Sequence, residues 1–344
     1  MKNIAFYDVK PYDKMYFEDL APLYGFNIRY FESKLHEHSA VLSQGCDGVI
    51  AFVNDSADKK TVESLDSLGV KVLALRSAGY NNVDLKAAYG KIHVLRVPAY
   101  SPYAVAEHTV ALLLALNRKI HRAYNRTREH NFALSGLTGF DLYGKTVGVI
   151  GTGRIGKVFI DICKGFGMKI IAYDVFPDKN SEIDYVSLDE LYKSSDIISL
   201  HCPLTKDTKH IIGERALSLM KDGVYILNTS RGQLIDTKAI LTAIKSKKVG
   251  AVGLDVYEEE EDFFFEDFSG EILEDDTLLR ILSMPNVLVT GHQAFLTKEA
   301  LENIAKVTLQ NLKDFFDGKA LKNEVCYRCE KFGTCTQTHE ERCF

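Results

Sequence analysis

The sequence predicts an α/β protein with two doubly wound domains, each built on a parallel sheet. Two stretches of the chain, residues 3–100 and 146–290, alternate short runs rich in β-branched residues with amphipathic helical patterns. Strands separated by helices form βαβ units, whose strands pair in parallel. The chain has 344 residues, which is more than one hydrophobic core usually supports. We therefore expect two domains rather than one large sheet.

Five predicted strands and two predicted helices make up the first stretch. The strands are Asn3–Tyr7, Asn27–Phe31, Gly48–Phe52, Lys71–Leu75 and His93–Val97, and the helices are Lys59–Leu68 and Val83–Tyr89. Ser101 and Pro102 then suit the N-cap and the first position of a long helix, Tyr103–Lys119. Because the apolar face of this helix is broad, we expect it to be buried between domains or between subunits.

The second stretch has the strand and helix spacing of a doubly wound nucleotide-binding sheet. Its predicted strands are Thr146–Ile150, Lys169–Tyr173, Ile197–His201, Val224–Asn228, Gly250–Val256 and Val287–Thr290. The predicted helices are Ile155–Phe166, Leu188–Lys193, Thr237–Lys245 and Lys298–Phe316. The last helix leaves this domain, and residues 317–324 then return towards the first stretch as an extended segment. We expect a discontinuous small domain (1–100 and 296–325), a larger domain (101–295) and a cysteine-rich tail (326–344).

The net charge, the apolar runs and the cysteine count limit which kinds of protein this chain could be. The formal net charge of −5 argues against binding to nucleic acid or to an anionic membrane surface. The longest apolar run, Val110–Leu116, is far too short to span a bilayer, and the N-terminal run is too short for a signal peptide. The seven cysteines are an odd number, which favours reduced thiols over a disulfide framework. A cytoplasmic protein is the expectation.

The sequence VGVIGTGRIG, residues 147–156, predicts a dinucleotide-binding site. It places an apolar strand before a glycine-rich turn and a helix. Gly151 permits the tight turn, Gly153 lets backbone amides approach a pyrophosphate, and Gly156 lets the helix pack closely on the strand. The helix N-terminus offers free N–H groups to that anion. Asp174 ends the next strand, where a carboxylate accepts a bond from a ribose hydroxyl and repels a 2′-phosphate, so NAD is favoured over NADP.

Four polar motifs follow the later strands of this domain. They are HCP at residues 201–203, NTSRG at residues 228–232, Asp255, and GHQAF at residues 291–295. Ligands of doubly wound sheets bind beyond the carboxyl ends of the strands, so these motifs are expected at one crevice. An arginine can hold a substrate carboxylate and polarise a keto oxygen, while a histidinium donates a proton as hydride reaches carbon. This set of groups suits the reduction of a 2-keto acid.

The chain resembles the D-2-hydroxyacid dehydrogenase family, and within it the NAD-dependent D-lactate dehydrogenases. The resemblance runs from about residue 3 to residue 325. The motifs that carry it are RSAGYNNVD (76–84), VPAYSPYAVAEHT (97–109), GTGRIG (151–156), NTSRGQLID (228–236), GLDVYEEE (253–260) and TGHQAF (290–295). It implies reversible reduction of pyruvate to D-lactate by NADH and an active site in the cleft between the two domains. The apolar helix after Pro102 separately leads us to expect a homodimer or homotetramer that uses this helix.

The resemblance also implies a set of site residues. The catalytic residues would be Arg231, Glu260 and His292, with His292 as the acid and base and Glu260 as its partner. The substrate would be bound by Ala78, Gly79, Tyr100, Arg231 and Phe295. The cofactor would be bound by Gly151, Gly153, Arg154, Ile155, Gly156, Asp174, Cys202, Pro203, Thr208, Thr229, Ser230 and Asp255.

Plainer interpretations remain for several of these residues. Without the resemblance, Arg231 could be a surface arginine, His292 a buried histidine, Tyr100 an interdomain packing residue and Asp255 a strand-end cap. Glu260 is one of four adjacent glutamates, and only the alignment to the family's motif selects it. The aromatic segment FFFEDF, residues 263–268, is either a solvated loop or, as we favour, a cover for the active site or an interface.

Two rival functions and an unusual tail stay open. The substrate could be a larger 2-keto acid, or the chain could be an NAD-sensing binding protein of the co-repressor type, although the Arg231, Glu260 and His292 set argues for an enzyme. The tail contains four cysteines, Cys326, Cys329, Cys335 and Cys343. The first pair has metal-ligand spacing, but the rest of the pattern does not match a standard zinc site. A metal site, a reduced disordered tail and disulfide or redox chemistry are the three interpretations.

Overall fold

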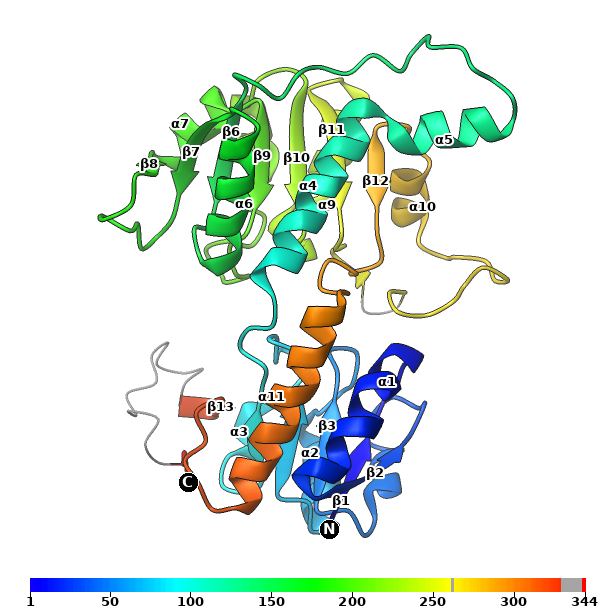
Figure 1. The fold of residues 1–344 in the computed structure, drawn as a ribbon, viewed down its shortest axis with the longest axis vertical. Helices are drawn as coiled ribbons and strands as arrows, with labels where there is room; N and C mark the ends of the chain where they lie inside the picture. Colours follow the sequence, from blue (N-terminus) through cyan, green and yellow to red (C-terminus); the bar gives the residue numbers. More distant parts are fainter. Residues whose placement is uncertain (261–262, 329–341) are drawn as a thin grey trace. The chain divides into compact units, whose positions relative to one another are not determined.

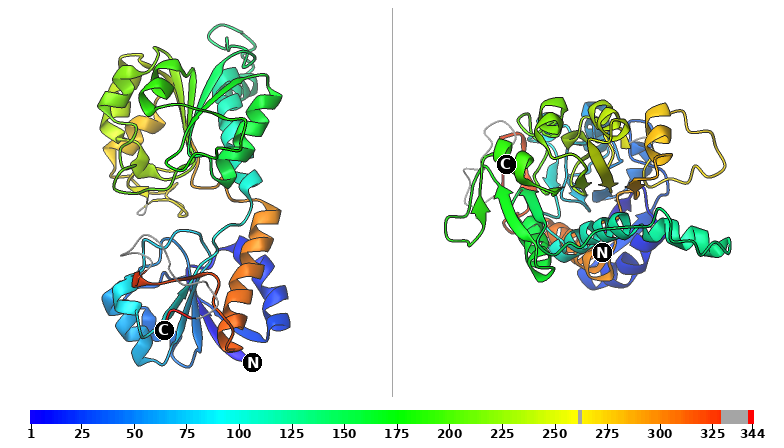
Figure 2. Two further views of the ribbon diagram at one scale, coloured as in Figure 1. Left: turned by 90° about the vertical axis from the view of Figure 1, so that its left-hand side faces the viewer. Right: turned by 90° about the horizontal axis from the view of Figure 1, so that it is seen from above.

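The computed structural model describes residues 1–260, 263–328 and 342–344 (Figure 1). The chain divides into two compact units. The small unit contains Met1–Ser101 and Leu296–Phe344, and the large unit contains Pro102–Phe295. Each unit is a sheet with helices on both of its faces, as expected for doubly wound domains (Figure 2, left).

The small unit holds a six-stranded sheet in the order β13-β5-β4-β3-β1-β2. Its strands are β1 (Lys2–Phe6), β2 (Phe26–Tyr30), β3 (Gly48–Ala51), β4 (Val72–Leu75), β5 (His93–Leu95) and β13 (Glu324–Val325). Strands β1 to β5 pair in parallel, and β13 pairs with β5 in the antiparallel direction. The sheet is therefore not wholly parallel, because the returning C-terminal segment adds an antiparallel edge strand.

Four helices cover the small sheet. Helices α1 (Pro11–Leu20) and α11 (Lys298–Phe316) pack on one face, where Phe17 and Leu309 join the core. Helices α2 (Lys59–Ser67) and α3 (Leu85–Ala88) cover the other face. The predicted strands match β1 to β5 within two residues at each end, whereas helix α1 was not predicted.

The large unit holds a seven-stranded parallel sheet in the order β12-β11-β10-β9-β6-β7-β8. The strands are β6 (Thr146–Ile150), β7 (Lys169–Tyr173), β8 (Asp184–Tyr185), β9 (Ile197–Leu200), β10 (Val224–Asn228), β11 (Val249–Leu254) and β12 (Val287–Val289). Counted from β6, the order is that of a Rossmann sheet, and the strand order reverses between β6 and β9. Ligands of such sheets bind beyond the carboxyl ends of the strands at this reversal.

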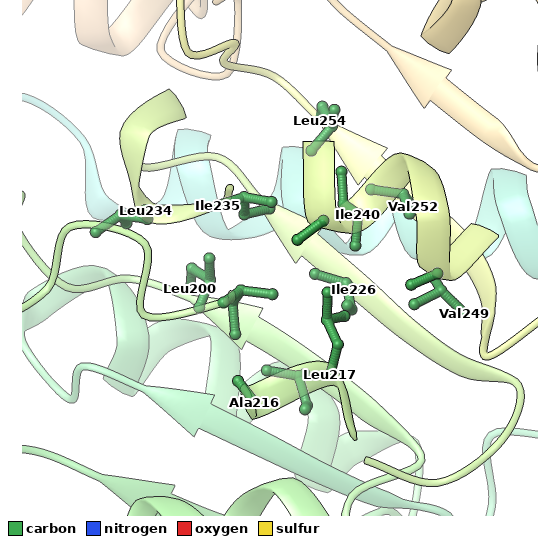
Figure 3. Packing of buried hydrophobic residues seen from close by; sticks show 14 of the residues in the cluster. Leu200, Ala216, Leu217, Ile226, Leu234, Ile235, Ile240, Val249, Val252 and Leu254 are labelled. Atoms are coloured by element: carbon green, nitrogen blue, oxygen red, sulfur yellow. The ribbon is translucent and has the colours of Figure 1, made fainter. Parts of the chain in front are cut away.

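The two faces of the large sheet have separate cores. Helices α4 (Pro102–Arg118) and α6 (Arg154–Gly165) cover one face. Helices α7 (Leu188–Ser194), α8 (Glu214–Leu219), α9 (Thr237–Lys245) and α10 (Asp276–Leu282) cover the other. Figure 3 shows part of this second core, where Ile226 of β10 and Val252 of β11 lie beside Leu217 of α8 and Ile240 of α9.

Helix α4 and the segment after it differ in burial. The apolar side chains of α4, including Ala106, Val110 and Leu113, pack on α6 and β11 within the large unit, so the expectation that this face is buried between domains or subunits is wrong. The next helix, α5 (Ile120–Arg128), was not predicted and has no buried residue. In Figure 1, α5 and the segment leading to β6 project from the body of the large unit. Among the described residues, no helix has the length and apolarity needed to cross a bilayer.

Candidate active site

A glycine-rich turn joins β6 to α6 at the carboxyl edge of the large sheet. Gly151 has a φ of 97°, and a Cβ on it would lie 2.6 Å from the backbone nitrogen of Cys202. A Cβ on Gly156 would lie 2.1 Å from the carbonyl oxygen of Gly151, so both positions require glycine. Around Gly153, the N-cap of α6, no atom of the described residues lies within 4 Å of the position of a Cβ. The turn and the helix N-terminus thus fit a pyrophosphate.

The carboxylate of Asp174, directly after β7, is fixed beside this turn. Its Oδ2 accepts hydrogen bonds from the backbone N–H of Thr152 at 2.6 Å and from the Thr152 hydroxyl at 3.0 Å. Its Oδ1 accepts from the backbone N–H of Phe176 at 2.9 Å. Because Thr152 is part of the glycine turn, the carboxylate stands where an adenosine ribose is bound in Rossmann domains. The residues present therefore fit NAD.

Side-chain bonds also shape the loop that follows β10. Asn228 donates from Nδ2 to the carbonyl oxygen of Arg231 at 2.8 Å, and Ser230 donates from Oγ to that of Cys202 at 2.7 Å. A Cβ on Gly232 would lie 1.9 Å from the carbonyl oxygen of Tyr257, so the loop backbone touches the segment that leads to Glu260. The loop thereby holds Arg231, whose side chain is half-buried, close to that segment.

The remaining cofactor candidates lie in the loops after β9 and β10 and at the start of α6. Cys202 is buried, which raises the pKa of its thiol to about 11 and keeps it protonated. Thr229 shares a hydroxyl hydrogen bond of 2.8 Å with Thr109 of α4. Thr208 donates from Oγ1 to the carbonyl oxygen of Pro203 at 2.7 Å. Arg154 is exposed and Ile155 is half-buried at the start of α6.

A hydrogen bond joins His292 and Glu260. The imidazole Nδ1 of His292 lies 2.8 Å from Oε1 of Glu260, and both side chains are about one-fifth exposed. The other oxygen of Glu260 accepts the backbone N–H of Tyr257 at 2.8 Å, so the carboxylate is anchored. Of the neighbouring glutamates, Glu258 bonds elsewhere, to His210 at 2.7 Å and Thr237 at 2.7 Å. Glu261 lies outside the described residues.

Asp255 holds the turn that carries His292. Its carboxylate is fully buried and accepts the Thr290 hydroxyl at 2.5 Å, the N–H of Gln293 at 2.9 Å and the N–H of Ala294 at 2.8 Å. The carbonyl oxygen of Asp255 also accepts the N–H of His292 at 2.8 Å. These bonds keep His292 at a φ of 52°, a left-handed conformation that is unfavourable for this residue type.

His108 of α4 completes this network. Its Nε2 lies 3.0 Å from the hydroxyl of Thr290 and 3.4 Å from Oδ1 of Asp255. Neither His108 nor Thr290 was singled out from the sequence. Both belong to motifs that were noted, residues 97–109 and 290–295, but nothing in either motif indicates that the two side chains meet.

The aromatic segment after Glu260 is packed, so the interpretation as a solvated loop is wrong. Phe264 is buried in the core of the large unit, and Phe263 and Phe265 are half-buried against it. The ring of Phe265 lies 5.6 Å from the imidazole of His292. Phe295, at the end of the His292 turn, is also buried. Phe265 thus brings an aromatic ring from this segment beside the imidazole of His292.

The other substrate candidates belong to the small unit. Ala78 and Gly79 form a half-buried loop after β4, held by Arg96, which donates to the carbonyl oxygen of Ala78 at 3.0 Å. Tyr100 accepts a bond from Asn303 at its carbonyl oxygen at 2.8 Å. Arg76, directly before the loop, is almost fully buried, and its guanidinium lies 3.4 Å from Asp13 and 3.8 Å from the Phe52 ring centre. Its burial was not foreseen from the sequence.

The tail is only partly within the described residues. Cys326 and Cys343 are buried thiols of the small unit, whereas Cys329 and Cys335 lie outside the described residues. Across residues 1–260, 263–328 and 342–344, no group of three or more histidine, cysteine or acidic side chains is arranged to hold a metal ion. The interpretation of the tail as disordered is wrong at its end, because residues 342–344 contact the small unit.

Comparisons with known proteins identify the family of this chain. Residues 110–294 match the family described as D-isomer specific 2-hydroxyacid dehydrogenase, NAD binding domain. A 2-hydroxyacid dehydrogenase homolog of Haemophilus influenzae is 55% identical over 329 residues, covering 94% of this chain and 99% of the relative. The D-lactate dehydrogenase of Escherichia coli is 50% identical over 327 residues, again covering 94% and 99%. The apo structure of D-lactate dehydrogenase from Escherichia coli superposes with a TM-score of 0.87, at 48% identity and with the same coverage.

The family match covers more than half of the chain, and the relatives cover nearly all of it. The Rossmann sheet, the glycine turn and Asp174 account for the NAD-binding domain that the family description specifies. The chain therefore belongs to the D-isomer specific 2-hydroxyacid dehydrogenase family and is an NAD-dependent oxidoreductase.

Proposed function

We propose that this dehydrogenase reduces pyruvate to D-lactate, reversibly, with His292 as the proton donor. The observation that carries the proposal is the 2.8 Å pair between His292 and Glu260 at the carboxyl edge of the sheet that binds the cofactor. A 50% identical relative is named D-lactate dehydrogenase, which supports pyruvate as the substrate.

The pairing of His292 assigns a task to each ring nitrogen. Because Nδ1 bonds Glu260, Nε2 is the nitrogen that meets the substrate. Bound NADH supplies the hydride for the keto carbon. The imidazolium of His292 gives its Nε2 proton to the keto oxygen, and the Glu260 carboxylate stabilises that cation before transfer. In the oxidation of D-lactate, the neutral imidazole takes the hydroxyl proton.

Arg231 is proposed to hold the substrate carboxylate and to polarise the keto oxygen. A guanidinium forms two parallel bonds to a carboxylate, which fixes the orientation of a small keto acid. The amides of Ala78 and Gly79 and the hydroxyl of Tyr100 are proposed to assist, which makes the small unit the substrate domain. Phe295, which is buried, is proposed to contribute an apolar wall near the substrate.

The proposed NAD contacts come from five parts of the large unit. Backbone groups of the glycine turn bind the pyrophosphate and Asp174 binds the adenosine ribose. The remaining proposed contacts are Arg154, Ile155, Cys202, Pro203, Thr208, Thr229, Ser230 and Asp255. For Asp255 the role is indirect, because its buried carboxylate is already bonded to the His292 turn.

The experiment that tests this function is NADH oxidation against a panel of 2-keto acids, with the chirality of each product determined. We expect the highest kcat/KM for pyruvate and a D-configured product. A preference for branched or aromatic keto acids would replace pyruvate by a larger substrate. NAD binding without turnover of any keto acid would indicate a binding protein of the co-repressor type and would overturn the enzymatic assignment.

We further propose a homo-oligomer, at least a dimer, that forms through α5 and the segment after it. The apolar face of α4 is covered within the large unit, so the exposed apolar side chains lie further on. They are Ile120, Tyr124, Phe132, Leu134 and Tyr143, each more than half exposed. Exposed apolar groups this close in the chain indicate a protein contact. Light scattering at micromolar concentration is expected to give a dimer or tetramer, and a monomer for the F132D/L134D variant. A monomeric wild type would refute the proposal.

The reaction also needs a pool of NADH, so we propose a cytoplasmic location. Fractionation of cells that express the chain tests this location.

A further inference from the structure

The C-terminal residues of the chain lie against the edge of the small sheet where β13 pairs with β5. The ring of Phe344 stacks on His93 of β5, with centroids 4.1 Å apart and planes inclined by 13°. The backbone N–H of Cys343 donates to Oε2 of Glu324 in β13 at 2.7 Å. The other oxygen of Glu324 lies 2.5 Å from Nδ1 of His93. The last two residues therefore contact β13 and β5, the two strands at this end of the sheet.

Arg342 adds a second attachment, to the end of α11. Its guanidinium donates to the carbonyl oxygens of Phe315 at 2.5 Å and Lys319 at 3.2 Å. The same group lies 5.0 Å from the centre of the Phe315 ring. Aromatic stacking, charge-assisted hydrogen bonds and a cation–π contact together fix the C-terminus by three independent means.

Two thiols meet at this attachment. The side chain of Cys343 forms a hydrogen bond with that of Cys326, the residue directly after β13. Cys326 is 5% exposed and Cys343 is 8% exposed, and neither is in a disulfide. Thiols already in contact need little backbone movement to reach the geometry of a disulfide.

We propose that Cys326 and Cys343 are a redox-active dithiol, which a hydroperoxide converts into a disulfide that ties the C-terminus to β13. One thiol, as its thiolate, attacks the peroxide; the O–O bond breaks, and a sulfenic acid and an alcohol form. The second thiol attacks the sulfenic sulfur, so that the S–S bond forms, the S–O bond breaks and water leaves. In sum, two thiols and one hydroperoxide give one disulfide, one alcohol and one water.

The surroundings determine how readily this dithiol reacts. Burial, with the neighbouring Glu324 carboxylate, raises the pKa of the Cys343 thiol. Since the thiolate is the reactive form, the pair resists mild oxidants at neutral pH and responds to sustained exposure. None of the residues proposed above to bind substrate or NAD lies in the cysteine-rich segment, residues 326–344.

Trypsin offers a direct test, because it places each tail cysteine in a separate peptide. Cleavage after lysine and arginine gives peptides 323–328, 329–331, 332–342 and 343–344, which contain Cys326, Cys329, Cys335 and Cys343 in that order. The full-length reduced protein is treated with hydrogen peroxide, alkylated with iodoacetamide and digested without reductant. We expect the linked pair 323–328 with 343–344 to dominate. The protein oxidised in guanidinium chloride is expected to give mixed pairings. Dominant pairing of Cys326 with Cys329 or Cys335 in the native protein, or alkylated Cys343 after the others have oxidised, overturns the proposal.

A measurement of Tm distinguishes the Cys326–Cys343 disulfide from oxidation of the other tail cysteines. The disulfide closes a loop of about 17 residues, so peroxide treatment is expected to raise the Tm of the small unit by roughly 6–12 °C, reversibly with dithiothreitol. The C329S/C335S variant should keep this shift and the C343S variant should lose it. A shift that survives C343S, or that disappears in C329S/C335S, contradicts the assignment. So does a purified protein with stoichiometric zinc on its thiols, since a metal would then be their ligand.

Discussion

Replacing Glu260 by glutamine tests the central ion pair of the site. Glutamine keeps the length of the side chain and one oxygen that can accept the Tyr257 N–H, but it removes the negative charge 2.8 Å from His292. A hydrogen bond to a charged group contributes about 1.5–3 kcal/mol, and about 1.4 kcal/mol corresponds to one pH unit. Reduction requires the imidazolium. Without the carboxylate that cation is less stable, so activity is lost at a lower pH, and the alkaline limb of kcat/KM for pyruvate should move down by about 1–2 units.

The neighbouring glutamates provide matched controls for this assay. Glu259 is exposed, so Glu259→Gln should leave the limb unmoved because surface charges are screened. Glu258 bonds His210 and Thr237 rather than His292, so Glu258→Gln should alter stability and leave the limb in place. Profiles are measured from pH 5 to 9 at constant ionic strength. An unmoved limb in Glu260→Gln, together with a moved one in Glu259→Gln, would refute the assignment of Glu260.

Four further outcomes are expected. Arg231→Gln should raise KM and lower kcat together, with kcat/KM reduced at least about 10²-fold. The reason is that the guanidinium holds both the carboxylate of the bound substrate and the charge that develops on the keto oxygen. Near-normal steady-state kinetics would contradict this role. Asp174→Ala should let NADPH replace NADH, measured as the ratio of kcat/KM for the two cofactors. Thr290→Val removes a donor from buried Asp255, so kcat should fall while the KM for NADH stays constant, and Thr290→Ser should restore kcat. Burial raises the pKa of Glu258, but the hydrogen bonds from Thr237 and His210 together lower it below its usual value. The wild type should therefore have a higher Tm than Glu258→Gln near neutral pH, and the difference should shrink as the pH falls below about 4.5.

The strands were predictable because their signal is local. Runs such as VGVIG (147–151) combine β-branched residues with a turn residue, and both sheets bury these runs on two faces. Helix α1 gave a weak signal because its apolar residues do not gather on one face, and only Asp13 and Phe17 of it are buried. Helix α5 was missed although Ile120, Ala123 and Tyr124 recur at helical spacing, because most of its residues are polar and none is buried. The antiparallel strand β13 is two residues long, too short for any periodicity.

The contacts within the site were harder to foresee because they join distant parts of the chain. Nothing in the run Glu258–Glu261 distinguishes Glu260 from its neighbours; the choice depends on how the loop after β11 folds back, with Tyr257 N–H fixing one oxygen. His108 and Thr290, whose side chains are hydrogen-bonded, are 182 residues apart in the sequence. The attachment of the C-terminus also depends on side chains from three separate elements, β5, β13 and α11.

Asp255 shows how the fold contributes to the chemistry without exposing a group. A strand-end carboxylate that is fully buried needs several donors, because an unpaired charge in the interior is very unfavourable. Here two of the donors are backbone N–H groups, of Gln293 and Ala294, on the turn that also contains His292. The same bonds therefore hold the turn in which His292 has a φ of 52° and Nδ1 lies 2.8 Å from Glu260. The buried carboxylate of Asp255 thus holds in place the turn that carries the proposed proton donor. The interpretation of Asp255 as a strand-end cap and a contribution of Asp255 to the reaction are therefore compatible.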